Sequence, residues 1–321
     1  MRKYVWSVFL ITSFFESCLG QEHIILRSKP YGMFSMLHHV LFFLDKYDKN
    51  EIDGLDIAFE ETGLYYKKEL GPNWWEYYFE PIHLQNNIES HERTIIREDD
   101  YYLNAKIIIF ESNTSIERMN YLVKKYIKPK QCVTNKVNKF KQANFENNYI
   151  IGVHYRGTDK IQEANQVGFN AIFEEIVLIV SAIPLHRNYK IFIATDEFYF
   201  LYYMIYKFGD KVCYLPCHRS VNGVPIHYDL AFDPYIKGEE ALLDCLLLAS
   251  ANVLIRTSSN LSLCSRYINP FQRTIELNQR FPGTYNGRNV EGYLTPTEQP
   301  TSDYLKEIVP ARPNDEDQGQ H

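Results

Sequence analysis

Short apolar runs alternate with stretches of helical apolar spacing along the second half of the chain. Residues 149–153 (YIIGV) form a continuous apolar run that predicts a buried strand, and the apolar positions at 171–183 recur as in a helix. The same alternation continues with predicted strands at 190–194, 211–215 and 252–255 and predicted helices at 198–208 and 239–250. Repeated strand–helix units predict a parallel, doubly wound sheet that binds ligands beyond the carboxyl ends of its strands.

The first half is less regular but begins with a similar unit. Residues 23–26 are a strand candidate, and a turn containing Gly32 leads into apolar positions at helical spacing from Leu37. A helix that starts at such a turn presents free backbone N–H groups to an anion. The aromatic segment 73–79 (NWWEYYF) is either a packing cluster or a platform on which sugar rings stack. We also predict a strand at 106–110 and a helix at 115–126.

Length and composition indicate an α/β protein of two domains. A chain of 321 residues exceeds the usual size of one hydrophobic core, about 250 residues, and 45% hydrophobic residues can build a substantial core. The polar segment 135–148, rich in Asn and Lys, is the predicted boundary. We therefore expect an N-terminal α/β domain at 21–145, a C-terminal Rossmann-like domain at 146–290 and a polar tail at 291–321.

The N-terminus has the pattern of an export signal. Arg2 and Lys3 precede an apolar run at 5–15 and then small residues before Gln21. This predicts a cleaved signal peptide at 1–20 and places the mature protein in the secretory-pathway lumen, in the periplasm or outside the cell. A short membrane anchor and a buried first strand are the alternatives, although the run is too short to span roughly 30 Å of hydrocarbon comfortably. We expect no stable membrane span after cleavage.

Charge and cysteine content limit the partners. With 34 basic and 40 acidic residues, a net charge of -6 gives no global attraction for nucleic acid, so any anion is bound locally. Of six cysteines, Cys18 falls in the predicted signal peptide; the remaining number is odd, so at least one thiol is free, with Cys245 the obvious candidate. Cys213 and Cys217 precede His218, but no second ligand pair follows at zinc-site spacing, so we expect no metal there, while a disulfide through one of them stays open.

Three predicted strands run directly into polar residues. Because the carboxyl ends of parallel strands meet at one edge of a sheet, these residues should form one polar pocket, although ordinary surface loops are the alternative. The residues are His154, Arg156, Thr158, Asp159, Lys160 and Glu163 after the first strand, Thr195 and Asp196 after the second, and Arg256, Thr257, Ser258, Ser259 and Asn260 after the third.

Three segments resemble those of the α-1,6-fucosyltransferases. Residues 152–160 (GVHYRGTDK) resemble the family motif H-x-R-R-T-D-K, and residues 244–248 and 257–260, with Cys264, resemble its helix and its T-F-S-S-Q-x-x-C segment in order and spacing. The segment 37–40 (LHHV), shortly after Gly32, looks like the family's Gly-rich N-terminal segment. The resemblance implies a GT-B fold of two Rossmann-like domains that transfers fucose from GDP-fucose to a glycan with inversion, the acceptor being held mainly by the N-terminal half.

The resemblance also implies the donor site. Arg156 would bind the β-phosphate of GDP, His154 and Asp244 would contact the guanosine, and Asp196 would help to form the site. Three residues would close over the diphosphate: Ser258, Ser259 and Asn260. Three N-terminal residues would also belong to the donor site: Gly32, His38 and His39.

Catalysis is implied for residues of the first motif. Glu163 would be the general base, although it stands one position nearer to Lys160 than in the family, and Asp159 and Lys160 join Arg156 as catalytic candidates. Gly157 replaces the second arginine of the motif and so removes one cationic contact, which leaves another nucleotide sugar as an alternative donor. A non-catalytic carbohydrate- or nucleotide-binding relative is the second alternative.

The chemistry of sugar transfer agrees with these residue types. A guanidinium suits the diphosphate leaving group, and a carboxylate can deprotonate the acceptor hydroxyl. The alternative role for Arg156 is purely structural, as an ion pair with Asp159 or Asp196. An Asp-x-Asp metal motif occurs only at 315–317, in the predicted tail, so we expect a metal-independent reaction with no cofactor.

Overall fold

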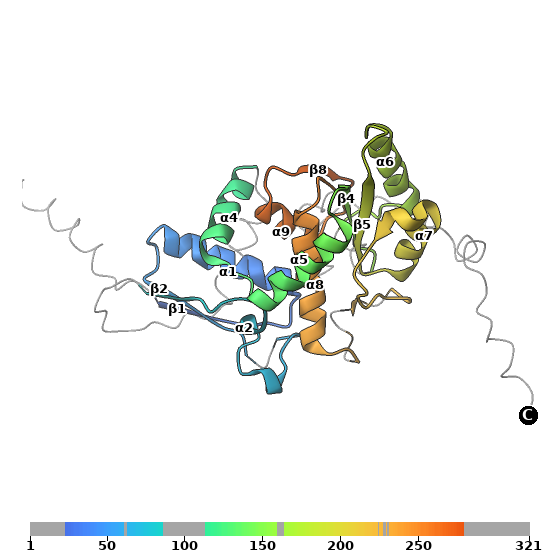
Figure 1. Ribbon diagram of the computed structural model, residues 1–321. Helices are drawn as coiled ribbons and strands as arrows, with labels where there is room; N and C mark the ends of the chain where they lie inside the picture. Colours follow the sequence, from blue (N-terminus) through green and yellow to red (C-terminus); the bar gives the residue numbers. More distant parts are fainter. Residues whose placement is uncertain are drawn as a thin grey trace, which may run out of the picture. The chain divides into compact units, whose positions relative to one another are not determined.

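The computed structural model describes residues 23–60, 63–85, 113–158, 164–223, 225–226, 229 and 231–278. The predicted signal peptide, the predicted strand at 106–110 and the predicted tail lie outside the described residues. The chain divides into two compact units, Met1–Pro129 and Lys130–His321 (Figure 1). In the described part of the chain, no helix combines the length and the apolar character that a membrane span requires.

The N-terminal unit contains a three-stranded sheet of order β1-β2-β3. Strand β1 (His23–Arg27) pairs in parallel with β2 (Gly54–Ala58), and β3 (His83–Gln85) pairs antiparallel to β2. Helix α1 (Met33–Asp48) connects β1 to β2, as the apolar spacing predicted, and contacts α4 (Asn113–Tyr126).

The aromatic segment of this unit serves packing. Its residues form the short helix α2 (Trp75–Tyr78), preceded by a single 3-10 turn, η1 (Lys68–Leu70). Trp74, Trp75 and Tyr78 are at most 1% exposed, and the Trp75 ring stacks on Phe79 at 4.3 Å between centroids. Side chains this deeply buried are core residues, so the packing alternative is correct for the segment 73–79.

The C-terminal unit is built on a parallel five-stranded sheet of order β6-β5-β4-β7-β8. Its strands are β4 (Tyr149–Tyr155), β5 (Tyr189–Thr195), β6 (Val212–Cys213), β7 (Val253–Arg256) and β8 (Arg273–Glu276). Its helices are α5 (Gln131–Asn144), α6 (Phe169–Ser181), α7 (Phe198–Phe208), α8 (Pro234–Ala249) and α9 (Asn260–Ile268), and a 3-10 turn, η4 (Gly209–Lys211), precedes β6. The predicted mixed α/β class with a parallel sheet is confirmed.

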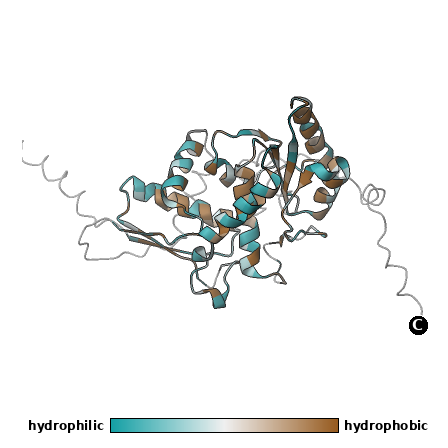
Figure 2. Cartoon of the chain, in the orientation of Figure 1, coloured by the Kyte–Doolittle hydropathy of each residue, from teal (hydrophilic) through white to brown (hydrophobic). Residues whose placement is uncertain are grey.

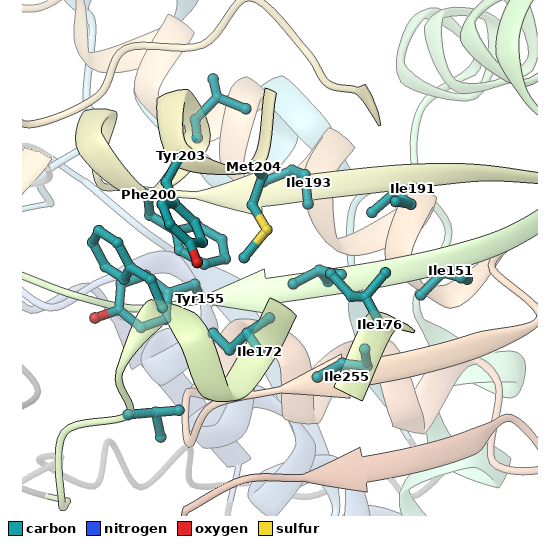
Figure 3. Packing of buried hydrophobic residues seen from close by; sticks show 14 of the residues in the cluster. Ile151, Tyr155, Ile172, Ile176, Ile191, Ile193, Phe200, Tyr203, Met204 and Ile255 are labelled. Carbon is teal, nitrogen blue, oxygen red and sulfur yellow. The ribbon is translucent and has the colours of Figure 1, made fainter. Parts of the chain in front are cut away.

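Helices cover both faces of this sheet. Alternate strand residues such as Ile151, Ile193 and Ile255 are fully buried against α6 and α7, where Figure 3 shows them pointing toward Ile176 and Met204. On the other face, Phe140 of α5 contacts Phe192 of β5, and Leu248 of α8 lies against Gly152 of β4. Since both faces are buried, the strands are nearly continuous apolar runs, and this made them predictable.

Some boundaries differ from prediction. The units divide between Pro129 and Lys130, ahead of the predicted boundary segment 135–148, because most of that segment belongs to helix α5. The helix buries only Val133 and Val137, and hydrophilic residues separate its few hydrophobic ones (Figure 2). The sequence pattern therefore predicted a polar connection. Helix α8 begins five residues before its predicted start, at 234 instead of 239, because Asp233 caps its N-terminus by accepting hydrogen bonds from Tyr235 N and Ile236 N.

Candidate functional site

The sheet of the C-terminal unit reverses its winding between β4 and β7. From β4 the chain moves outward to β5 and β6, and it then returns to the other side of β4 to form β7 and β8. The carboxyl ends of β4 and β7 are therefore a topological switch point, and doubly wound sheets bind nucleotides in the crevice at such a point. His154 and Arg256 are register partners at this edge.

The loops after β4 and β7 are joined directly. Arg156 N donates a hydrogen bond to Thr257 Oγ1 at 2.9 Å, and Thr257 N donates to the carbonyl oxygen of His154 at 3.0 Å. The two motif segments, about a hundred residues apart in sequence, thus form one backbone arrangement. His154 itself lies within β4 and is 4% exposed, so it belongs to the sheet and not to the loop that the sequence predicted.

Asp196 organises the loop that carries Arg156. Its Oδ2 contacts Arg156 Nε at 3.0 Å and accepts a hydrogen bond from Thr158 Oγ1 at 2.6 Å. Its Oδ1 accepts from Gly157 N at 3.1 Å. The ion pair that the sequence raised as an alternative is therefore present, and it orients the guanidinium through Nε. A guanidinium has five N–H donors in a planar fork, and this contact engages one of them.

Glu197 occupies the space beside Gly157, the position at which the family motif has its second arginine. A Cβ atom placed on Gly157 would overlap Glu197 Oε2 and lie 2.7 Å from Tyr155 Cε1. Burial and the neighbouring Asp196 raise the pKa of Glu197 to about 7. Glu197 was not predicted from the sequence, although its position directly after Asp196 at a strand end was a usable signal.

A buried arginine, Arg256, stabilises the loop after β7. Arg256 is 3% exposed; its Nη1 contacts Glu276 Oε1 at 2.7 Å and its Nε donates to Ser262 Oγ at 2.9 Å. Arg256 is thus a structural residue of the site. Ser258 and Ser259, at 6% and 7% exposed, follow in the same loop, where Arg256 Nη2 donates to the carbonyl oxygen of Ser259 at 3.2 Å.

Helix α9 starts at this loop. Ser259 caps it by accepting a hydrogen bond from Leu261 N at 3.3 Å, and Asn260 is its first residue. Ser258 N donates to Asn278 Oδ1 at 2.7 Å, and Asn278 Nδ2 donates to the carbonyl oxygen of Asn165 at 2.5 Å. A helix N-terminus favours negative charge, so the predicted diphosphate-closing residues stand where an anion is stabilised. Asn278, which follows β8, was not predicted.

Asp244 lies on α8, which covers the His154 side of β4. It is 7% exposed, and its Oδ1 makes no hydrogen bond to the residues that the structure describes. Burial raises its pKa to about 7, with Arg219 acting in the opposite direction. A buried carboxyl whose oxygen makes no hydrogen bond to described residues is a suitable acceptor for the N–H groups of a nucleobase.

The remaining predicted residues belong to the N-terminal unit or lie outside the described part of the chain. Gly32 is the N-cap of α1, where Met33 N donates to the hydroxyl of Tyr65 at 2.8 Å. His38 and His39 are 2% and 5% exposed within α1, and burial lowers the pKa of His39 to about 4, so its ring is neutral at pH 7. Three predicted catalytic residues lie outside the described part of the chain: Asp159, Lys160 and Glu163.

The cysteine region shows ordinary packing. Cys213, Cys217 and Cys245 are free thiols, and His218 Nδ1 contacts Glu240 Oε1 at 3.2 Å. Among the described residues, no three His, Cys, Asp or Glu side chains are grouped so that they could hold a metal ion.

Comparison with known proteins gives the fold. No protein-family model matches the sequence, and no curated protein is significantly similar to it in sequence. The structure is similar to that of fucosyltransferase NodZ from Bradyrhizobium, with 16% identity, a TM-score of 0.55, and coverage of 81% of this chain and 98% of that chain. NodZ α-1,6-fucosyltransferase co-crystallised with GDP gives 17% identity, a TM-score of 0.52, and coverage of 80% and 94%. NodZ α-1,6-fucosyltransferase soaked with GDP-fucose gives 18% identity, a TM-score of 0.50, and coverage of 78% of this chain and 93% of that chain. The chain therefore shares the fold of the NodZ fucosyltransferases, the group to which its three sequence motifs pointed.

Proposed function

We propose that this protein is a glycosyltransferase of GT-B architecture that transfers fucose from GDP-fucose to a glycan acceptor. The observation that carries the proposal is the joining of Arg156 to Asp196 and Thr257 at the crevice between β4 and β7. The two motif segments that suggested the function meet there. The NodZ structures with the same fold were obtained with GDP and GDP-fucose, which supports a guanine nucleotide sugar as donor.

The proposed reaction breaks the bond between C1 of the sugar and the diphosphate oxygen. The acceptor hydroxyl oxygen attacks C1 from the opposite side, its proton passes to a carboxylate, and GDP leaves with the bonding electrons. Arg156 and the N-terminal end of α9 would stabilise the negative charge that develops on the leaving diphosphate. Asp196 would keep the guanidinium oriented, so that no binding energy is lost in ordering it.

Two carboxylates are candidates for the general base. Glu163 is implied by the family motif, and Glu197 has a pKa near 7, where a group can both accept and release a proton at neutral pH. Profiles of kcat against pH for Glu163→Gln and Glu197→Gln separate them. The base is the residue whose replacement abolishes transfer and cannot be compensated by raising the pH.

The first experiment is a calorimetric titration with GDP, UDP and GDP-fucose, with and without EDTA, followed by an assay of GDP release with glycan acceptors. We expect binding of GDP but not UDP, insensitive to EDTA, because the charge of Arg156 replaces a metal ion. Arg156→Ala should abolish transfer with an unchanged circular dichroism spectrum, since the lost charge serves the leaving group. Near-normal transfer by Arg156→Ala, or activity that EDTA removes and Mn²⁺ restores, contradicts the proposal.

A second candidate is the same scaffold with a different nucleotide sugar. It is favoured by Gly157, which removes the positive charge of the motif's second arginine, and by Glu197, whose carboxyl occupies the space that a Cβ atom at position 157 would take. Preferential binding of another nucleotide in the same titration would select it. Nucleotide binding without GDP release under any acceptor would instead indicate a non-catalytic relative.

We further propose that residues 1–20 direct export. The N-terminal sequence of protein recovered from an expressing cell tests this: cleavage near Gln21 supports it, and an intact Met1 contradicts it.

A further inference from the structure

Helix α7 carries a row of three aromatic rings, of which the first and the last are exposed and the middle one is half-buried. Phe198, Tyr202 and Tyr206 are four residues apart in sequence and so lie on one side of the helix; we call them the aromatic stripe. Phe198 is 41% and Tyr206 68% exposed. The opposite side of α7 carries Phe200 and Met204, both fully buried in the core (Figure 3). The core of the unit is therefore complete without the aromatic stripe.

The rings of Phe198 and Tyr202 are nearly parallel, with 22° between their planes and 6.4 Å between centroids. The ammonium of Lys207 lies 5.8 Å from the centroid of the Tyr206 ring. The helix rises about 12 Å from Phe198 to Tyr206, which accommodates roughly two or three six-membered rings in a row.

The chemistry of the stripe suits a carbohydrate. Its rings offer apolar faces, while two phenolic hydroxyls and Lys207 offer hydrogen bonds at the edges. A pyranose ring has the complementary form, with an apolar face of C–H groups and a rim of hydroxyls. A lipid chain or an aliphatic peptide would remove the tyrosine hydroxyls from water without pairing them, which costs free energy.

The stripe begins at the candidate site. Phe198 follows directly after Asp196 and Glu197 at the end of β5. Phe198 N donates to the carbonyl oxygen of Ser220 at 2.9 Å, and Ser220 N donates to that of Asp196 at 2.8 Å. The first ring of the stripe is thus fixed by the same backbone that fixes the carboxylate holding Arg156.

We infer that the aromatic stripe binds the sugar chain of the glycan acceptor and directs its end toward the site at Asp196 and Glu197. This inference rests on the proposed function, and it adds an acceptor subsite in the C-terminal unit. Acceptors long enough to extend along α7 gain contacts that a disaccharide does not reach.

The test uses the full-length double variant Tyr202→Ala/Tyr206→Ala. The control is Leu178→Ala, which removes an apolar side chain of α6 that is 63% exposed, against 68% for Tyr206. Rates of GDP release are measured with disaccharides and hexasaccharides that have glucose, mannose or N-acetylglucosamine backbones. The double variant should show a KM for its hexasaccharide acceptor that is raised roughly tenfold, with unchanged KM for the disaccharide and unchanged Kd for GDP. Equal hexasaccharide KM values in wild type and double variant would overturn the inference.

Direct titration of the same sugars, without donor, separates this inference from the proposed function. If the wild type neither binds GDP nor releases it, the proposed function fails, but a hexasaccharide affinity lost only in the double variant still supports the stripe. Absence of hexasaccharide binding by the wild type overturns it. A wild-type dimer in sedimentation that dissociates in the double variant would also overturn it, because the stripe would then be covered by a second copy of the chain.

Discussion

Replacement of Glu197 by glutamine should change how the stability of the protein depends on pH. Burial and the adjacent Asp196 raise the pKa of this carboxyl from 4.5 to about 7, so the fold favours the neutral form. The stabilising effect of a raised pKa is fully present at a pH below the pKa of the unfolded chain. It is lost as the pH rises through the pKa of the folded protein. The difference between the two pKa values corresponds to about 3 kcal/mol of unfolding free energy.

The assay is urea unfolding of the wild type and of Glu197→Gln between about pH 4.5 and pH 8. Glutamine preserves the shape of the neutral carboxyl but does not titrate. The wild type should therefore lose about 3 kcal/mol relative to the variant over this range, with most of the loss complete by about pH 7. Glu117→Gln, which changes an exposed carboxyl on α4, is the control for loss of one negative charge.

The comparison isolates one group. Asp244 also has a pKa near 7, but it titrates in both proteins and cancels in the difference. Parallel stability curves for wild type and Glu197→Gln would refute the reasoning, because they would show that the carboxyl is as well solvated in the fold as in the unfolded chain. Glu197 would then also lose its place as a candidate general base.

Three further changes test the packing around the site and in each unit. Arg118→Ala should lower the unfolding free energy at pH 7 by about 2 kcal/mol, since it removes a 2.7 Å contact from the buried carboxylate of Asp45; urea unfolding measures this. Asn278→Ala should raise the Kd for GDP about fivefold in calorimetry, because Ser258 N loses the hydrogen-bond acceptor that orders its loop, a contribution of about 1 kcal/mol. An unchanged Kd would show that Asn278 is not part of the site. Asp233→Ala should cost about 1 kcal/mol of stability by uncapping α8, and thermal unfolding with the same midpoint as the wild type would contradict this.

The sequence was most informative where strands are buried on both faces. Continuous apolar runs marked β4, β5 and β7 to within two residues, and Gly209, at a φ of 54°, ends α7 where predicted. Prediction failed for elements whose stability depends on tertiary contacts. Helix α5 has few apolar residues, and it is held by packing on α8 and by the 2.6 Å ion pair of Lys136 with Glu239.

The candidate site divides in the same way. Motif segments selected Arg156 and the loop at Ser258, and the end of a predicted strand selected Asp196. All three follow strand ends that a parallel sheet brings to one edge. These patterns did not select Glu197 or Asn278. Their roles depend on a side chain that occupies the space above Gly157 and on an amide that links two distant loops.

The sequence by itself determined the class of fold, the positions of its main strands and the polar edge at which they end, because local apolar spacing and chain order are sufficient for these. Only the tertiary structure decided which loops are joined, which carboxyl is desolvated and which aromatic rings stay exposed. These properties depend on contacts between residues far apart in the chain. For example, Phe198 and Phe200 have the same side chain, and only their orientation relative to the core separates an exposed ring from a buried one.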